Sequence, residues 1–132
     1  GSFPPGSGFH AVVPARLLET REEAGQIGYA GPKPGPGAVV ELTLAGATSS
    51  VVPPSASAVV LNVTATGASA DGYVTVWPCD RSMPTVSNLN LRGGQSAPNL
   101  VIVRPDTSGR VCLFTERGTH LLADLAGYFG TP

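Results

Sequence analysis

Charged side chains are scarce in this chain: they make up 13% of its 132 residues, against roughly a quarter in a typical soluble domain. The formal net charge is −1 and the isoelectric point is about 6.1. This balance gives the chain no overall basic face, which argues against nucleic-acid binding through one. Seven of the eight basic residues are arginine. Because arginine forms planar, bidentate contacts, we expect several arginines to make structural ion pairs.

Long hydrophobic runs are also lacking. No segment approaches the roughly 20 apolar residues of a membrane span, and no stretch has the 3.6-residue period of a long helix. The apolar residues, 42% of the chain, alternate in short blocks among 17 glycines and 13 prolines. This pattern is typical of short strands joined by tight turns. Strands are predicted at residues 38–45, 58–66, 72–78, 85–92, 98–104, 110–116 and 119–128, and residues 12–21 form a further short strand or a helical turn.

The length fits one domain with a substantial core. Residues 1–11 contain glycine-rich steps and Pro4-Pro5, which predict a tag remnant and linker, followed by a single β domain over residues 12–130. We predict an all-β fold, an antiparallel β-sandwich of about seven to nine short strands. A β-trefoil or β-prism is the alternative, because a polar residue recurs beside leucine in several strands, as in residues 61–63 and 88–90.

Cysteine is limited to Cys79 and Cys112. An even count in a β domain of low charge is compatible with one disulfide and an oxidising compartment. Two separate buried thiols are the alternative. A bridge would enclose 34 residues, counting both cysteines, and loop-closure entropy would make it worth about 3–4 kcal/mol.

Aromatic residues are few, at 6%, and Trp77 is the only tryptophan. Strand alternation puts Tyr73 and Trp77 on the same face of the 72–78 strand, with Val74 and Val76 on the other. One interpretation is an exposed stacking platform for sugar rings. The other is that Trp77 packs on a disulfide and Phe114 inside the sandwich. The candidate ligand-binding residues of the platform are Trp77, Tyr73, Asp71, Asp80, Arg81 and the loop residue Tyr29.

Polar residues recur inside the predicted strands although Asn and Asp are poor strand formers. The interpretation we favour is a buried hydrogen-bond network, and the alternative is a polar binding face. An ion pair of Asp124 with Arg16 or Arg21 would tie the N-terminal segment to the last strand. The predicted structural network consists of Arg16, Arg21, Asn62, Asn88, Asn90, Asn99 and Asp124.

No reaction centre is recognisable. A zinc site needs three or four ligands at suitable spacing, and His10, His120 and the two cysteines have no such spacing. The nucleophile turn of serine hydrolases is missing, and no pair of carboxylates has a spacing that recommends it for glycan hydrolysis. We therefore predict a protein that is not an enzyme and that uses no metal or cofactor.

Several phrases carry a family resemblance. They are Pro14-Ala-Arg-Leu-Leu-Glu-Thr-Arg21, Leu61-Asn-Val-Thr64, Gly72-Tyr-Val-Thr-Val-Trp-Pro-Cys79, Ser87-Asn-Leu-Asn90, Asn99-Leu-Val101, Val111-Cys-Leu113 and Leu122-Ala-Asp-Leu-Ala-Gly-Tyr-Phe129. Together they resemble a small all-β module that recurs in secreted, mostly actinobacterial, multidomain proteins beside proteases, glycan hydrolases and cell-wall enzymes. The usual opening phrase has Asp where this chain has Glu19.

The resemblance implies one disulfide between Cys79 and Cys112, since this cysteine pair recurs in the family. It also implies an extracellular or cell-surface location and neighbouring domains in a longer chain. The expected function is a non-catalytic accessory module that binds cell-wall or insoluble polysaccharide and targets a neighbouring enzyme. The alternative is a structural spacer or protein-protein interaction module without a small ligand. An exposed Trp77 would favour the first role, and a sealed Trp77 the second.

Overall fold

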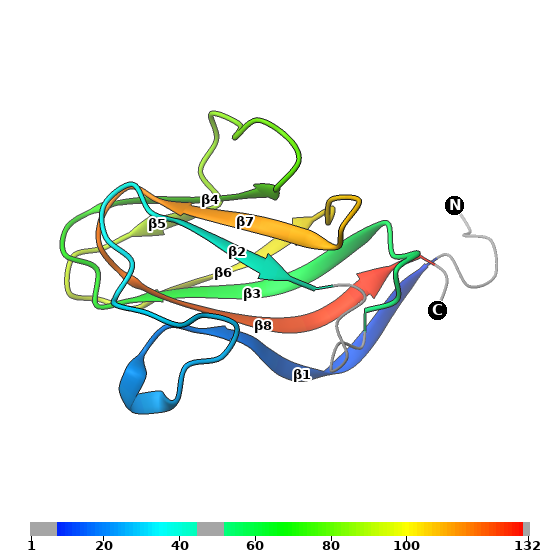
Figure 1. Ribbon diagram of the computed structural model, residues 1–132, viewed down its shortest axis with the longest axis horizontal. Helices are drawn as coiled ribbons and strands as arrows, with labels where there is room; N and C mark the ends of the chain where they lie inside the picture. The colour runs from blue at the N-terminus through cyan, green and yellow to red at the C-terminus, as the bar shows by residue number, and fades with distance from the viewer. Residues whose placement is uncertain (1–7, 45–51, 131–132) are drawn as a thin grey trace.

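The computed structural model describes residues 8–44 and 52–130, which form two antiparallel four-stranded sheets packed face to face (Figure 1). The first sheet has the order β1 (Phe9–Glu19), β8 (His120–Phe129), β3 (Ala58–Thr66) and β6 (Ala97–Val103). The second has the order β2 (Val39–Thr43), β7 (Arg110–Thr115), β4 (Gly72–Pro78) and β5 (Leu89–Leu91). A 3-10 turn, η1 (Glu22–Ala24), follows β1. The predicted antiparallel sandwich is confirmed, and the trefoil and prism alternatives are wrong.

The core lies between the two sheets and is built by alternation along each strand. In β3, Val59, Leu61 and Val63 are fully buried, whereas Asn62 between them is exposed. In β4, Val74 and Val76 face the core from the opposite sheet. The described residues contain no helix long and apolar enough to cross a membrane.

The first strand begins earlier than predicted. Phe9 and His10 pair with Phe129 and Tyr128 of β8, and their rings pack at centroid distances of 5.2 and 5.0 Å. The linker prediction is therefore wrong for residues 9–11, because pairing with β8 overrides the glycine-rich local sequence. Residues 1–7 lie outside the described part of the chain. The register shift between Ala11 and Ala15 spans Pro14, which lies on this edge strand, where a missing N–H disrupts no second ladder.

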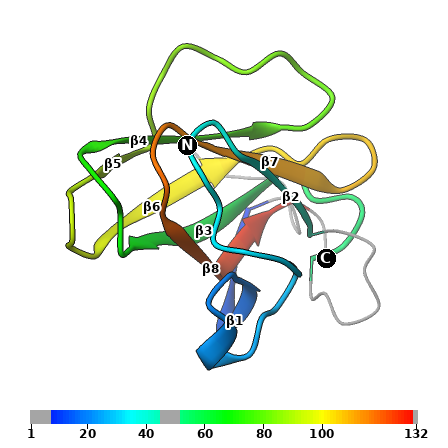
Figure 2. The ribbon, with the colours of Figure 1, turned by 60° about the vertical axis from the view of Figure 1, so that its left-hand side comes forward.

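The predicted strand at 85–92 is reduced to β5, three residues long. The residues before it form a loop, 79–88, that leaves β4 on the outer side of the second sheet, away from the first sheet (Figure 2). Thr75 Oγ1 donates a 2.7 Å hydrogen bond to the Val86 carbonyl, and the Asn88 side chain accepts one from the Val76 N–H. These bonds hold the loop against β4, and this arrangement creates the candidate site.

Candidate ligand cleft beside the disulfide

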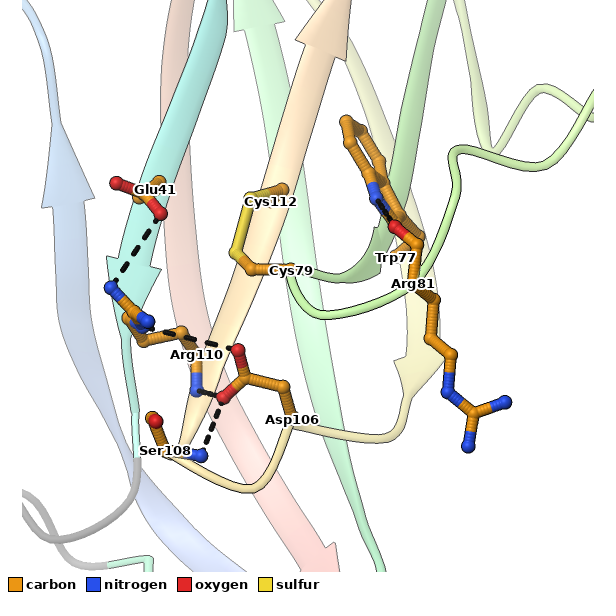
Figure 3. The surroundings of a disulfide bond; sticks show 8 residues. All are labelled: Glu41, Trp77, Cys79, Arg81, Asp106, Ser108, Arg110 and Cys112. Atoms are coloured by element: carbon orange, nitrogen blue, oxygen red, sulfur yellow. Dashed lines mark hydrogen bonds and ion pairs between the residues drawn. A yellow bond between two sulfur atoms is a disulfide. The ribbon is translucent and has the colours of Figure 1, made fainter.

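The disulfide between Cys79 and Cys112 is confirmed, with a Cα–Cα distance of 5.1 Å. Cys112 alternates with Val111 and Leu113, which are fully buried in the core. The bridge therefore lies on the outer face of the second sheet and not between the sheets. It attaches the start of the 79–88 loop to the middle of β7 (Figure 3).

Trp77 is directly opposite Cys112 in the register of β4 and β7, on the same outer face. Only 7% of the residue is exposed, and its Nε1–H donates a 3.0 Å hydrogen bond to the Arg81 carbonyl, as Figure 3 shows. Trp77 does not belong to the inter-sheet core cluster. The exposed-platform interpretation is therefore wrong for Trp77, and the alternative is right that the ring is buried beside the disulfide but wrong in placing it inside the sandwich. The ring is neither an exposed platform nor part of the sandwich interior, because the loop folds back over the outer face and covers it.

Three other residues of the predicted platform, Tyr73, Tyr29 and Asp71, do not gather around Trp77. Tyr73 is half-buried at the start of β4, where its ring lies 5.9 Å from that of Phe114, at an interplanar angle of 43°. Tyr29 donates its hydroxyl to the Pro32 carbonyl at 2.6 Å within its own loop. Asp71 accepts a hydrogen bond from the Gly93 N–H at 2.9 Å. The structure does not bring these three residues together with Trp77.

A cleft of about 710 Å³ opens between the 79–88 loop and the turn that joins β6 to β7. It collects three of the predicted site residues, Trp77, Asp80 and Arg81. Sequence reasoning missed the opposite wall, which comes from the segment after β6. The full lining is Ala56, Trp77, Pro78, Asp80, Arg81, Ser82, Pro84, Arg104, Pro105, Asp106 and Thr107.

Asp106 is committed to the structure of its own turn. Its Oδ1 accepts hydrogen bonds from the Ser108 and Arg110 N–H groups, both at 2.8 Å. Its Oδ2 lies 3.9 Å from the Arg110 guanidinium, which also reaches Glu41 at 3.6 Å (Figure 3). Glu41 lies within 4.8 Å of both cysteine sulfurs, but sulfurs joined in a disulfide are not the thiolates that bind metal ions. The Asp106 side chain thus shapes the wall of the cleft and leaves little capacity for a ligand.

Asp80 and Arg81 lie at the other wall. Asp80 Oδ2 accepts a long hydrogen bond, 3.5 Å, from the Thr107 N–H, and so connects the two walls. The Arg81 guanidinium is 3.9 Å from Asp80, and 73% of its side chain is exposed. Arg104 is exposed, and no carboxylate of the described residues forms an ion pair with it. The two arginines therefore have most of their N–H donors available.

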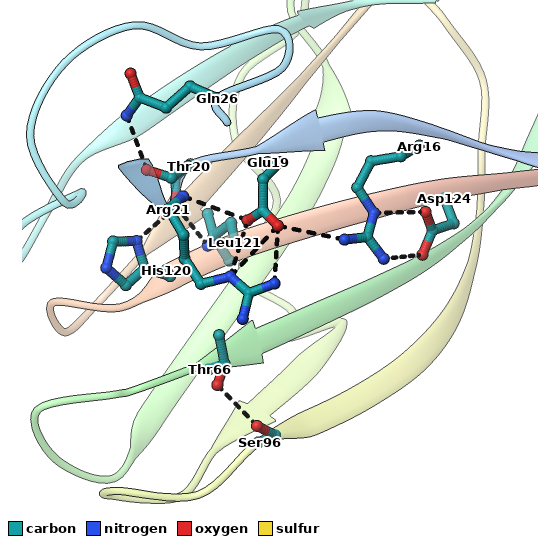
Figure 4. Close-up of polar contacts among 10 residues, drawn as sticks. All are labelled: Arg16, Glu19, Thr20, Arg21, Gln26, Thr66, Ser96, His120, Leu121 and Asp124. Atoms are coloured by element: carbon teal, nitrogen blue, oxygen red, sulfur yellow. Dashed lines mark hydrogen bonds and ion pairs between the residues drawn. The ribbon is translucent and has the colours of Figure 1, made fainter. Parts of the chain in front are cut away.

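The polar residues predicted as one network do not form a single network in the structure. Arg16 and Asp124 form a two-point ion pair across β1 and β8, at 2.8 and 3.2 Å (Figure 4). Arg21 does not reach Asp124 and binds Glu19 at 2.8 Å instead. Asn88 bonds the β4 backbone, as described above, and its carbonyl accepts a hydrogen bond from Asn99. The predicted burial is wrong for the three asparagines that are exposed, namely Asn62, Asn90 and Asn99, although Asn99 does satisfy a backbone group as predicted.

Glu19 is the residue of this cluster that sequence reasoning missed. It is 1% exposed, and its carboxylate accepts hydrogen bonds from Arg21 and from Arg16 Nη1, the latter at 3.2 Å (Figure 4). The hydrogen bonds from Arg21 hold the pKa of Glu19 below its usual range, although burial opposes them. The hydrogen bond to Asp124 raises the pKa of Arg16. The cluster joins the end of β1 to β8 on the first sheet, so its role is structural.

His120 is likewise engaged in structure. Its Nδ1 lies 2.9 Å from the Thr20 hydroxyl oxygen, and that oxygen accepts a hydrogen bond from the Leu121 N–H (Figure 4). Burial lowers the pKa of the imidazole, which favours its neutral form. His120 thus helps to attach the end of β1 to the start of β8.

No protein-family model matches the chain, and no curated protein matches it.

Proposed function

We propose that this chain is a non-catalytic binding module of an exported bacterial protein. In this proposal the cleft beside the Cys79–Cys112 disulfide holds a segment of cell-wall or other insoluble polysaccharide. Binding there would keep a neighbouring enzyme on the polymer. The observation that carries the proposal is the cleft itself, about 710 Å³ in volume and walled by a loop that is attached at several points.

The lining of the cleft suits a sugar chain. The volume lies within the range of about 300–1,000 Å³ that is usual for ligand sites. Pro78, Pro84 and Pro105 offer stiff apolar surfaces for the C–H faces of sugar rings. The side chains of Ser82 and Thr107 can exchange hydrogen bonds with sugar hydroxyls. A lining of this mixed character supports a polar ligand with apolar faces.

The walls are preorganised, which lowers the entropic cost of binding. The disulfide holds one end of the loop, and Asn88 holds the other through the Val76 N–H. Between them the Arg81 and Val86 carbonyls accept hydrogen bonds from Trp77 and Thr75. A ligand would therefore meet a formed cleft.

Two observations support the remaining parts of the proposal. A disulfide persists in oxidising compartments, which fits an exported protein. Asp80 and Asp106 are the carboxylates of the cleft, and only 3% of the Asp106 side chain is exposed, with its Oδ1 accepting two backbone N–H groups and its Oδ2 lying 3.9 Å from Arg110. Glycan hydrolysis needs two positioned carboxylic groups, so a binding role fits this lining better than hydrolysis.

Sedimentation with insoluble polymers tests the proposal. We expect the protein to sediment with at least one of peptidoglycan, chitin and cellulose. Ser82→Tyr places a ring in the cleft and should weaken that binding about tenfold or more, the cost of losing a few contacts. Ser69→Tyr adds the same ring at the turn before β4, the opposite end of this strand, and should bind like the wild type. Failure of all polymers to bind, or unchanged binding by Ser82→Tyr, would contradict the proposal.

The second candidate is a structural spacer or protein-protein interaction module. The burial of Trp77 favours it, because the chain then lacks the exposed tryptophan that glycan-binding surfaces use for stacking. This candidate predicts that no polymer protects Trp77 from acrylamide quenching or sediments with the protein. Trp77 is the only tryptophan, so its fluorescence has a single source.

A further inference from the structure

The charged residues of the cleft are unevenly paired. Asp106 is satisfied inside its turn by two backbone N–H groups and lies beside Arg110. Asp80 has 41% of its side chain exposed, and one of its carboxylate oxygens accepts a hydrogen bond from the Thr107 N–H. Both carboxylates therefore contribute to the walls of the cleft.

The arginines of the cleft have weaker partners. Arg81 lies 3.9 Å from Asp80 with 73% of its side chain exposed, and an exposed pair at that distance holds a guanidinium only weakly. Arg104, on the facing wall, has no carboxylate partner among the residues of the two described segments. By contrast Arg16, Arg21 and Arg110 each have a carboxylate within 3.6 Å. Two guanidinium groups with unused donors thus line the same cleft from opposite sides.

We propose that the polymer bound in this cleft is anionic, and that Arg81 and Arg104 bind its carboxylate or phosphate groups. This inference rests on the proposed function, since it assigns a ligand class to the same site. The planar guanidinium fork matches the two oxygens of a carboxylate or phosphate group. Because the arginines belong to different walls, successive acidic units of one chain can contact both.

The specificity follows from the same chemistry. A neutral polysaccharide would leave both guanidinium groups in contact with water and gain only contacts to the prolines and hydroxyls. An acidic one gains charge-assisted hydrogen bonds, which are about twice as strong as neutral ones. Because the site is open to solvent, added salt weakens these contacts.

The experiment compares polymers that differ in charge. Calorimetric titration would use polygalacturonate, its methyl ester as the matched neutral polymer, and poly(glycerol phosphate) as the phosphate-bearing polymer. We expect one of the acidic polymers to bind about tenfold or more tightly than the methyl ester. The better of the two identifies carboxylate or phosphate as the group recognised. The affinity should fall as salt rises from about 50 to about 500 mM.

The variants are Arg81→Gln, Arg104→Gln and their combination. Each single change should weaken binding of the acidic polymer about tenfold, and the combination should abolish its advantage over the methyl ester. Arg92→Gln is the matched control, because Arg92 also lies 3.9 Å from an aspartate, Asp71, with most of its side chain exposed, and does not line this cleft. It should bind like the wild type.

Two failures can be told apart. If the methyl ester binds as well as the acidic polymers, or the double variant keeps full affinity, the anionic assignment is overturned. Loss of insoluble-polymer binding in Ser82→Tyr would then still support a glycan cleft. If no polymer of either charge binds, both the proposed function and this inference are overturned.

Discussion

Replacing Glu19 by glutamine removes a buried charge while keeping the shape of the side chain. Glu19 is 1% exposed and accepts hydrogen bonds from Arg21 and Arg16, so the amide would leave one guanidinium without a carboxylate. Breaking a fully buried pair costs about 3–5 kcal/mol. Here 33% of the Arg21 side chain and 38% of the Arg16 side chain are exposed and can be hydrated. Solvent screening therefore reduces the expected cost to about 2 kcal/mol.

The assay is urea denaturation of Glu19→Gln and wild type at several pH values. At pH 7 we expect the free energy of unfolding to fall by about 2 kcal/mol. In thermal unfolding the same loss would lower Tm by about 7 °C for a domain of this size. The folded-state pKa of Glu19 is lowered, so its stabilisation is complete above the pKa of the unfolded chain, about 4.3. It is lost as pH falls through the lower folded-state pKa, because the wild type then also carries a neutral side chain.

The difference between the two proteins should therefore be largest near neutral pH and shrink in acid. Glu22→Gln, at an exposed position in η1, is the control and should change stability by no more than about 0.5 kcal/mol. The reasoning is refuted if Glu19→Gln equals the wild type at pH 7, or if their difference stays constant down to about pH 2.

Three further predictions concern the frame of the cleft and the edge strand. Replacing Cys79 and Cys112 by serine should cost about 3–4 kcal/mol in urea denaturation; an unchanged midpoint would contradict this. Gly127→Ala places a Cβ 2.5 Å from the Phe9 ring and 2.6 Å from the His10 carbonyl, so the strain should lower stability by about 1–3 kcal/mol in thermal unfolding, and a neutral result would mean that β1 can shift freely. Asn88→Ala leaves the Val76 N–H without its acceptor and should cost about 1–3 kcal/mol. In that variant hydrogen exchange should rise at residues 79–88 more than in β3, and equal rates would contradict the role assigned to Asn88.

Much of the sandwich could be predicted from local patterns. Alternation in residues 58–66 and 72–78 predicted β3 and β4 with their apolar faces, because the side-chain period of a strand is a local property. The short β5 could not be predicted, since Asn88 bonds the neighbouring strand through its side chain and the regular ladder covers only three residues. The early start of β1 depends on Phe129 and Tyr128, which lie at the other end of the chain.

The candidate site, too, could be predicted from the sequence only in part. Trp77, Asp80 and Arg81 could be selected from the sequence because they are neighbours along it. Arg104 and Thr107 are more than 20 residues away, and only the packing of their turn beside the loop makes them the facing wall. Glu19 could be noticed as the acidic position of the opening phrase, but its burial could not be predicted, because it depends on how Arg16 and Arg21 pack around the carboxylate.

The sequence by itself determined the all-β class and the alternating faces of the strands, and its two cysteines left Cys79–Cys112 as the one possible bridge within the chain. The tertiary structure alone decided what covers each face. Both faces of β4 are apolar enough to be buried, so alternation cannot tell which one meets the other sheet. Val74 and Val76 are packed between the two sheets, whereas the 79–88 loop covers Trp77 on the other face and forms one wall of the cleft. That outcome depends on contacts between distant segments, which no local pattern encodes.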